Sequence, residues 1–105
     1  MNNQEFNERT RQRIDFIRSE KKISYRKSLA IAIRAEYIIE NMLKGSVSFT
    51  FITRTGKRRD VKGTLNSYKK QFGTNYNTKS MNCFIPYLDL YTGKWSAFHI
   101  SSIIV

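Results

Sequence analysis

The segment around which this chain is organised runs from Gly45 to Leu65 and reads GSVSFTFITRTGKRRDVKGTL. Apolar and polar residues alternate in its first half, which is the two-residue period of a half-buried strand. The apolar positions of this half are Val47, Phe49 and Phe51. Thr55 and Gly56 then favour a tight turn, because glycine adopts the positive φ that such a reversal needs.

The residues after this turn predict a returning strand with two different faces. One face carries Val61, Gly63 and Leu65, and the other carries Arg58, Asp60, Lys62 and Thr64. Two strands joined by so short a loop pair antiparallel. We therefore expect a hairpin that buries aromatic rings on one side and displays cations on the other.

Two helices are predicted before this hairpin. After a loose start at residues 1–4, the residue types from about Glu5 to Lys22 favour a first helix with a narrow apolar stripe. The members of that stripe are Phe6, Ile14 and Ile17. A helix this polar needs a partner surface to be stable. It is expected either to dock on the body or to become ordered on binding an anion.

The second predicted helix has clearer limits. Ser24 or Ser28 can cap its start, and Gly45 can end it. Its core-facing stripe consists of Ile31, Ala32, Ala35, Ile38, Ile39, Met42 and Leu43. A smaller apolar cluster on another side is expected to receive the first helix. That cluster is Leu29, Ala30, Ile33 and Tyr37, and the facing residues are Ile14, Phe16 and Ile17.

The segment from Asn66 to Ser80 is polar and rich in asparagine, threonine, glycine and serine, so we expect a long loop. Aromatic residues and lysines are interleaved in it. They are Tyr68, Phe72 and Tyr76 among Lys69, Lys70 and Lys79. This pattern suits single-stranded nucleic acid, where rings stack on bases and cations meet phosphates. It equally suits rings that hold the loop against the body.

Three further strands are predicted downstream. Met81 to Leu90 contains Pro86, which implies an edge position or a bulge because proline donates no ladder hydrogen bond. A turn at residues 91–94 leads into a strand from Trp95 to Ile100. A short break at residues 101–102 precedes a last strand at 103–105.

These elements predict an α+β fold in one domain over residues 5–105. Two N-terminal helices over 5–44 are followed by a five-stranded antiparallel small β-barrel over 45–105, which removes open sheet edges by closing. The predicted core is Phe49, Phe51, Val61, Leu65, Leu88, Leu90 and Trp95, covered by Ile31, Ile38 and Ile39 of the second helix.

The net charge of +11 is concentrated in two segments. Residues 9–27 hold eight cations against two carboxylates, and residues 54–70 hold seven cations against one carboxylate. Such concentration suggests a polyanionic partner, either nucleic acid or an acidic protein. The candidate nucleic-acid-binding residues are Arg9, Arg11, Arg13, Arg18, Lys21, Lys22, Arg26, Lys27, Arg54, Lys57, Arg58, Arg59, Lys62, Tyr68, Lys69 and Lys70.

Residues for catalysis or metal binding are sparse. The eight carboxylates are scattered, and neither a phosphate-binding glycine motif nor a metalloprotease motif occurs. Asp89 and His99 can meet across the predicted turn at 91–94, but a lone contact of this kind is more often structural than catalytic. With one histidine and one cysteine, a metal site is not expected either. We predict no enzymatic activity, metal or cofactor.

The cellular location follows from the cysteine count and the apolar runs. Cys83 is the single cysteine and cannot form an internal disulfide. No apolar run approaches the ~20 residues that cross a bilayer, and the start of the chain is polar rather than a signal peptide. We therefore expect a cytoplasmic protein that does not enter a membrane.

Three short motifs in the second half carry a family resemblance. They are KGSVSFTF at 44–51, the Gly63-Thr64-Leu65 step, and YLDLYTGKWSAF at 87–98. Together they resemble the WYL-type, Sm-like small β-barrel proteins of bacteria and phages. The resemblance covers Lys44 to Val105 and implies a helical segment followed by a Src-homology-3-like barrel. The family usually has arginine directly after this tryptophan, where this chain has Ser96.

Two functions of different classes follow from these observations. Related WYL-type domains occur in regulators and are thought to sense nucleotides or nucleic acid, so the resemblance implies that class of partner. The first function is a non-enzymatic nucleic-acid-binding protein, a small regulatory or phage-derived factor with modest sequence selectivity. The second is a protein-interaction module that grips an acidic protein, such as a host defence factor or a virion component. A phage-borne protein of either kind would act in the host cytoplasm.

Overall fold

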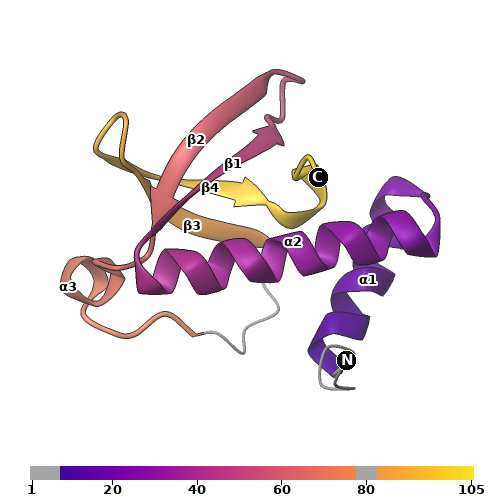
Figure 1. Ribbon diagram of the computed structural model, residues 1–105, viewed down its shortest axis with the longest axis horizontal. Coiled ribbons are helices and arrows are strands. Elements are labelled where there is room, and N and C mark those ends of the chain that lie inside the picture. Colours follow the sequence, from indigo (N-terminus) through magenta and orange to yellow (C-terminus); the bar gives the residue numbers. More distant parts are fainter. Residues whose placement is uncertain (1–7, 78–82) are drawn as a thin grey trace.

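The computed structural model describes residues 8–77 and 83–105. The predicted loose start at 1–4, Phe6, Lys79 and the Met81 end of the third strand lie outside the described residues. Two helices, α1 (Glu8–Lys21) and α2 (Tyr25–Lys44), precede an antiparallel sheet of four strands, so the fold class is α+β. Helix α2 runs along the sheet, and α1 lies beside its N-terminal end (Figure 1).

Helix α2 begins and ends where its sequence predicts. The Ser24 hydroxyl accepts the backbone N–H of Lys27 at 3.2 Å, and the backbone N–H of Gly45 donates to the Asn41 carbonyl at 2.9 Å. These bonds satisfy backbone groups that a helix leaves without partners at its ends. The apolar stripe faces the sheet. Its buried residues are Ile31, Ala32, Ala35, Ile38, Ile39 and Met42, whereas Leu43 is half-buried.

Helix α1 docks on the body through Ile14 and Ile17, both fully buried. In the α2 cluster predicted to receive it, Leu29 packs against the core but the other three residues are exposed, so that prediction is wrong for most of the cluster. The exposed residues of that cluster are Ala30, Ile33 and Tyr37. Docking is directed by Glu36 instead, because Thr10 donates a hydrogen bond to its carboxylate at 2.8 Å and Arg13 forms an ion pair with it at 3.4 Å.

The sheet has the order β1-β2-β3-β4 with every neighbouring pair antiparallel. Its strands are β1 (Ser46–Ile52), β2 (Arg58–Thr64), β3 (Phe84–Asp89) and β4 (Lys94–His99). Seven residue pairs join β1 to β2, and Gly56 turns the hairpin with a φ of 87°. Only two pairs, Gly63–Asp89 and Thr64–Leu88, join β2 to β3. The far half of the β1–β2 hairpin therefore stands away from the other strands (Figure 1).

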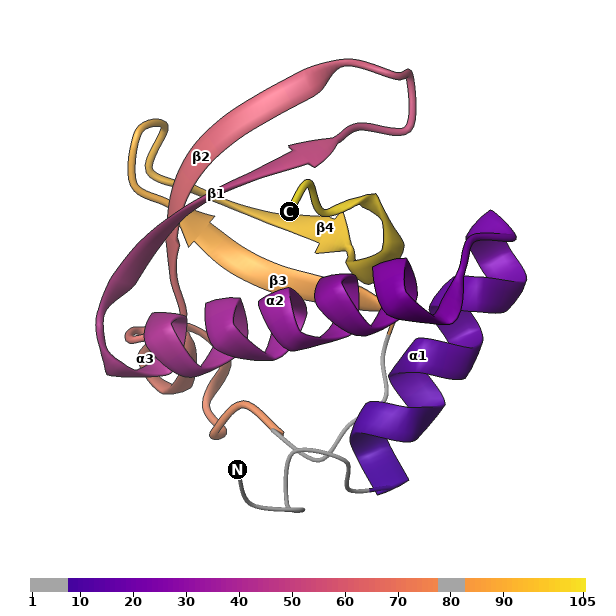
Figure 2. The ribbon, with the colours of Figure 1, turned by 45° about the vertical axis from the view of Figure 1, so that its right-hand side comes forward.

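The predicted fifth strand at 103–105 is wrong, because a shorter connection replaces it. A 3₁₀ helix, η2 (Ile100–Ser102), follows β4, and Ile103 then forms an isolated bridge to Phe51. The backbone N–H of Ile104 donates to the Thr50 carbonyl at 2.9 Å. The helical turn takes up the segment directly after β4, and Ile103 is the residue that then pairs with β1. The chain still returns from β4 to β1, as a small barrel requires (Figure 2).

The inner face of the β1–β2 hairpin is as predicted. Its buried residues are Phe49, Phe51, Val61 and Gly63, and Leu65 beyond β2 is buried as well. Thr64 departs from the prediction, because it is buried although it alternates with the polar face. Its hydroxyl lies within hydrogen-bonding distance of the carbonyl groups of Met42 and Gly45. This contact joins the hairpin to the end of α2.

The predicted faces of the β3–β4 hairpin are wrong. Leu88 and Trp95 are half-buried, and Leu90 is 45% exposed. The buried positions of this hairpin are Ile85, Tyr87, Asp89 and Phe98. The predicted parity fails because both faces of the hairpin carry large apolar residues, so alternation alone does not identify the inner one.

A short helix, α3 (Tyr68–Phe72), stands where a long loop is predicted. It lies at the C-terminal end of α2 (Figure 1). The Trp95 ring centroid is 6.0 Å from that of Tyr68 and 5.0 Å from that of Phe72. These contacts cover part of the outer face of β3–β4 and explain why Trp95 is not in the main core.

Pro86 lies within β3 at a point where one side of the strand has no ladder partner among the described residues, so the predicted edge position is confirmed locally. It faces Ala97 of β4 in the ladder. On its other side the β2–β3 pairing has already ended at Leu88. The missing N–H of proline therefore leaves no ladder hydrogen bond unmade.

Candidate nucleic-acid interface

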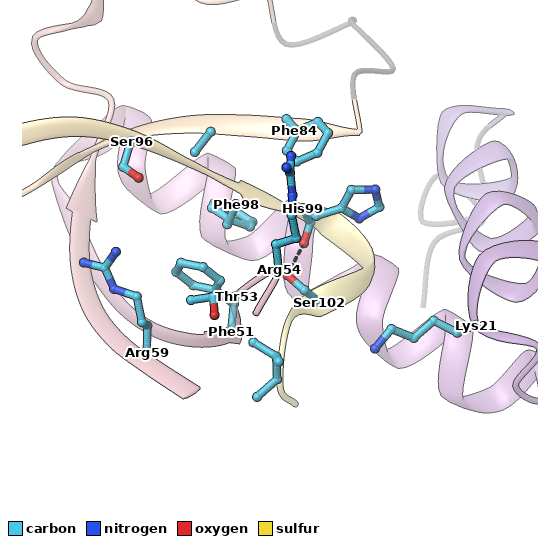
Figure 3. Close-up of a pocket in the computed structure, with 12 residues that line it drawn as sticks. Lys21, Phe51, Thr53, Arg54, Arg59, Phe84, Ser96, Phe98, His99 and Ser102 are labelled. Carbon is cyan, nitrogen blue, oxygen red and sulfur yellow. Dashed lines mark hydrogen bonds between the residues drawn. The ribbon is translucent and has the colours of Figure 1, made fainter. Parts of the chain in front are cut away.

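A cavity of about 520 Å³ lies between the far half of the β1–β2 hairpin and β4 (Figure 3). Small-molecule and cofactor sites have volumes of this order. The hairpin contributes Phe51, Ile52, Thr53, Arg54 and Arg59, and β4 contributes Ser96, Ala97, Phe98 and His99. Lys21, Phe84 and Ser102 complete the lining.

The sheet topology creates this cavity. Strand β4 is last in the sheet order, and among the described residues it pairs only with β3, so its other edge has no ladder partner there. The return to β1 is limited to the bridge between Phe51 and Ile103. Beyond that bridge the hairpin and the β4 edge face each other without pairing.

Three cations from both basic segments meet at the cavity. Lys21 is the last residue of α1, Arg54 lies in the hairpin turn, and Arg59 lies on β2. Among the described residues, Lys21 and Arg54 have no ion-pair partner, and no acidic side chain lines the cavity. The surface of the cavity therefore has a positive sign with uncompensated charge at its rim.

Arg59 is fixed by a carboxylate beneath the cavity. One of its guanidinium nitrogens lies 3.3 Å from Asp89, whose side chain is only 3% exposed. Asp89 also accepts the backbone N–H of Tyr91 at 2.8 Å. The carboxylate thus orders both the β3–β4 turn and the guanidinium, whose side chain remains 43% exposed.

The hydroxyl of Tyr87 lies buried behind the wall of the cavity. Tyr87 is fully buried, it opposes Ser96 in the ladder, and its hydroxyl makes no hydrogen bond of ordinary geometry with the described residues. Burial raises the pKa of Tyr87, and the nearby Ser96 hydroxyl and Arg59 offset only part of that rise. Ser96 itself is exposed to the cavity.

His99 holds the end of β4 against α1. Its Nδ1 accepts the backbone N–H of Ser101 at 3.1 Å, and its Nε2 lies 4.0 Å from the Glu20 carboxylate. Its ring centroid is 5.7 Å from that of Phe16 and 4.9 Å from that of Phe84. These contacts place the end of α1 beside the cavity.

Most of the first basic segment lies on the exposed surface of α1 and the start of α2. The exposed cations are Arg11, Arg18, Lys21, Lys22, Arg26 and Lys27. Arg13 differs, because it is 3% exposed and paired with Glu36. Arg9 belongs to α1, and its side chain lies outside the described part of the structure.

The second basic segment is divided among several surfaces. Arg54 and Arg59 line the cavity, and Lys57 lies in the exposed turn. The outer face of β2 carries Arg58 and Lys62. The remaining members belong to α3 and are Tyr68, Lys69 and Lys70. Arg58 forms an exposed ion pair with Asp60 at 3.5 Å. Helix α3 lies at the opposite end of α2 from the α1–α2 turn, so its lysines are remote from Lys21 (Figure 1).

Sequence reasoning missed the contribution of β4 to this site. Ser96, Ala97 and Ser102 carry no charge, and although Ser96 and Ala97 lie in the 87–98 motif, neither was a candidate binding residue. The available signal was topological, because the strand before the break at 101–102 ends the sheet and so presents a free edge. The prediction that Asp89 and His99 can meet is wrong, since they pair with Lys94 and Phe84 at opposite ends of the ladder.

The described residues offer neither a cluster of metal ligands nor a membrane-spanning helix. Within residues 8–77 and 83–105, no group of three or more histidine, cysteine, aspartate or glutamate residues is arranged to hold a metal ion. In the same part of the chain, none of the helices combines the length and the apolar character that crossing a bilayer requires.

A protein-family comparison covers most of the chain. The model of the WYL_2 family, described as an Sm-like SH3 β-barrel fold, matches residues 35–104. The match begins within α2, earlier than the Lys44 boundary of the predicted resemblance, and it includes every cavity residue except Lys21. No curated protein and no solved structure shows a significant match.

Proposed function

Because the chain belongs to the WYL_2 family, with its Sm-like SH3 β-barrel fold, we propose that it is a non-enzymatic binding module whose ligand is nucleic acid. The binding surface is centred on the cavity between the β1–β2 hairpin and β4. Exposed cations of α1, of the start of α2 and of the hairpin turn extend it.

The observation that carries this proposal is the meeting of the two basic segments at one concave site. Lys21 comes from the first segment, and Arg54 and Arg59 come from the second. A concavity lined by one sign of charge focuses the electric field and attracts an oppositely charged polymer. The Arg13–Glu36 ion pair also supports the proposal, because it joins α1, the helix that carries Lys21, to α2.

Binding would act chiefly through phosphate neutralisation. Each phosphate that a lysine or arginine neutralises releases condensed counterions, so affinity falls as salt rises. Contacts of this kind position a protein without reading sequence. We therefore expect strong salt dependence and modest sequence selectivity.

Two charge-matched double variants test the proposal. Lys21→Ala with Arg54→Ala removes two cations at the cavity, and Lys69→Ala with Lys70→Ala removes two at the opposite end of α2. On labelled single-stranded DNA, the plot of log affinity against log salt should become shallower by about 1.4 for the cavity variant, from roughly 0.7 for each lost contact. The α3 variant should keep the slope of the original protein.

Other outcomes of this experiment are equally informative. Equal losses in the two variants would mean that the whole charged surface binds, with no centre at the cavity. Full affinity in the cavity variant would remove the cavity from the proposal. No binding of DNA or RNA at low salt would overturn the function itself.

A second candidate is a module for an acidic, extended protein segment. The free edge of β4 favours it, because unpaired strand edges accept an added strand. A polyglutamate peptide with the same charge as the oligonucleotide separates the two functions. Tighter binding of the peptide, with a change in the amide resonances along β4, would favour the protein partner.

A further inference from the structure

We propose that the cavity receives one unpaired nucleotide of the bound strand and that the main-chain N–H and C=O of Ala97 hydrogen-bond the edge of its base. This inference rests on the proposed function and names the unit of nucleic acid that the cavity takes. The phosphate of that nucleotide lies at the rim with Lys21 and Arg54.

The direction of the Ala97 backbone groups follows from the β3–β4 register. The backbone N–H of Ile100 donates to the Cys83 carbonyl at 2.9 Å, in register with the ladder. Hydrogen-bonded and non-hydrogen-bonded pairs alternate in an antiparallel ladder. Phe98 therefore points its backbone groups toward β3, and Ala97 points its own toward the free edge. The bond from the Ser102 hydroxyl to the His99 carbonyl at 2.6 Å agrees, because residues 97 and 99 share an orientation.

A strand edge of this kind matches the hydrogen-bonding edge of a base. Ala97 lines the cavity, its side chain is small, and no β-strand pairs along this edge in the described residues. Its N–H and C=O offer one donor and one acceptor side by side. Unpaired bases display adjacent donors and acceptors on their Watson–Crick edges, whereas in a duplex these groups are already paired. The cavity therefore suits a single strand or an unpaired position.

The remaining lining suits the other parts of a nucleotide. Phe84 is 55% exposed and provides a ring on which a base can stack, and Phe51 and Phe98 form an apolar wall. The exposed Ser96 hydroxyl adds a hydrogen-bonding group that serves as donor or acceptor. Figure 3 shows Ser96 and Arg59 at one side of the cavity and Lys21 at the other.

A pair of short ligands tests whether a base enters the cavity. One is a three-nucleotide thymidine oligomer, and the other has the same sugars and phosphates without bases. The thymidine oligomer should bind about five-fold more tightly or better, the smallest effect expected from one stacked base. In the unaltered protein, the amide resonance of Ala97 should shift with the thymidine oligomer and stay in place with the abasic one.

A pair of variants at residue 97 tests the main-chain contact. Ala97→Pro removes the N–H at a position that makes no ladder bond, and proline is tolerated on such edges. Ala97→Ser is the matched control, because it changes the side chain and keeps the N–H. The proline variant should bind the thymidine oligomer as weakly as the abasic one and keep its affinity for the latter. The serine variant should retain the preference for bases.

The outcomes separate this inference from the proposed function. Equal, salt-dependent binding of both oligomers with an unmoved Ala97 amide would overturn the base site and leave phosphate binding intact. Equal loss in the proline and serine variants would overturn the main-chain contact. If the proline variant does not fold, the Ala97 amide shift in the unaltered protein decides. No binding of either oligomer would overturn the inference together with the proposed function.

Discussion

The two hairpins of the sheet have opposite relations to the core. In β1–β2 one face is buried under α2, and the other face carries Arg58, Asp60 and Lys62 to the surface. In β3–β4 the inner face contains the carboxylate of Asp89, and the outer face contains the half-buried ring of Trp95. Apart from Arg59 at the cavity and the buried Thr64, polar and apolar residues separate in the first hairpin, whereas they mix in the second.

The contrast between the hairpins shows when alternation identifies the inner face of a strand. Where one side of a sheet faces water, apolar residues on that side are disfavoured and the period-2 pattern has one reading. Where a further element covers the outer side, the residues on both faces of the strand are apolar. Helix α3 is that element here, through the contacts of Tyr68 and Phe72 with Trp95.

The largest expected effect comes from comparing Phe49 with Leu90, both predicted core residues. The Phe49 ring is 4% exposed, and its centroid lies 4.8 Å from that of Phe98. Phe49→Ala should lower the free energy of unfolding by about 3–5 kcal/mol, as expected for a buried ring. Leu90→Ala, at a position 45% exposed, should change it by less than about 0.5 kcal/mol. Urea unfolding measures both changes. Equal losses of stability would mean that Leu90 is a core residue and that the inner face of the second hairpin is the one predicted from the sequence.

Gly63 allows a test of how closely the two hairpins pack together. A Cβ at this position would lie 3.0 Å from the Tyr87 ring, 3.2 Å from the Phe49 ring and 3.3 Å from the Met42 sulfur. Because all three neighbours are in the core, Gly63→Ala should destabilise by about 1–3 kcal/mol through overpacking. Lys62→Ala, the adjacent outward residue, serves as the control and should be near neutral. A neutral Gly63→Ala would show that the neighbouring rings move apart without penalty.

The first hairpin and α2 were predictable because each depends on local signals. The Ser24 cap, the Gly45 end and the one-sided alternation around Phe49 each act within a few residues. The α1 contact, α3 and the short return at Ile103 depend on partners far along the chain. Local pattern therefore predicted the two long helices and the two hairpins, and it failed where a segment takes its structure from distant contacts.

The candidate site shows the same limit. The two basic segments are visible in the sequence, and the structure brings Lys21, Arg54 and Arg59 to one cavity. Which arginines turn toward carboxylates was not visible, since Arg13 and Arg59 pair with the distant residues Glu36 and Asp89. The free edge of β4 had no signal in its residue types, because backbone groups are the same for every residue type except proline, and only the predicted order of the strands pointed to it.

Trp95→Ala tests whether α3 depends on the second hairpin. The Trp95 side chain is half-buried between β4 and α3, so its removal should lower the free energy of unfolding by about 1–2 kcal/mol, less than for a fully buried ring. Amide hydrogens of α3 should exchange faster, while those of β1 stay protected. Tyr91→Ala, at a residue 71% exposed in the turn of the same hairpin, is the control. Unchanged exchange in α3 would mean that Trp95 does not hold that helix.

The smallest effect concerns the Tyr87 hydroxyl, the polar group that the second hairpin buries without a partner among the described residues. At pH 7, Tyr87→Phe should leave stability unchanged or raise it by up to about 1 kcal/mol, because a buried hydroxyl without a hydrogen bond is unfavourable. Burial raises the pKa of Tyr87 in the folded state. The unfolded chain therefore ionises first, near pH 10, and stability falls as pH rises above that value.

Phenylalanine cannot ionise, so Tyr87→Phe should reduce the loss of stability between pH 9 and pH 11, measured by urea unfolding. Burial also raises the pKa of Tyr76. The Tyr87→Phe variant should therefore still lose some stability at high pH, but less than the original protein. Tyr91→Phe, at the exposed turn, should show the full loss and is the control. A Tyr87→Phe variant clearly less stable at pH 7 would mean that the hydroxyl is satisfied, with Ser96 as its partner. The two hairpins would then differ less, because the buried hydroxyl on the inner face of the second hairpin would have a hydrogen-bond partner.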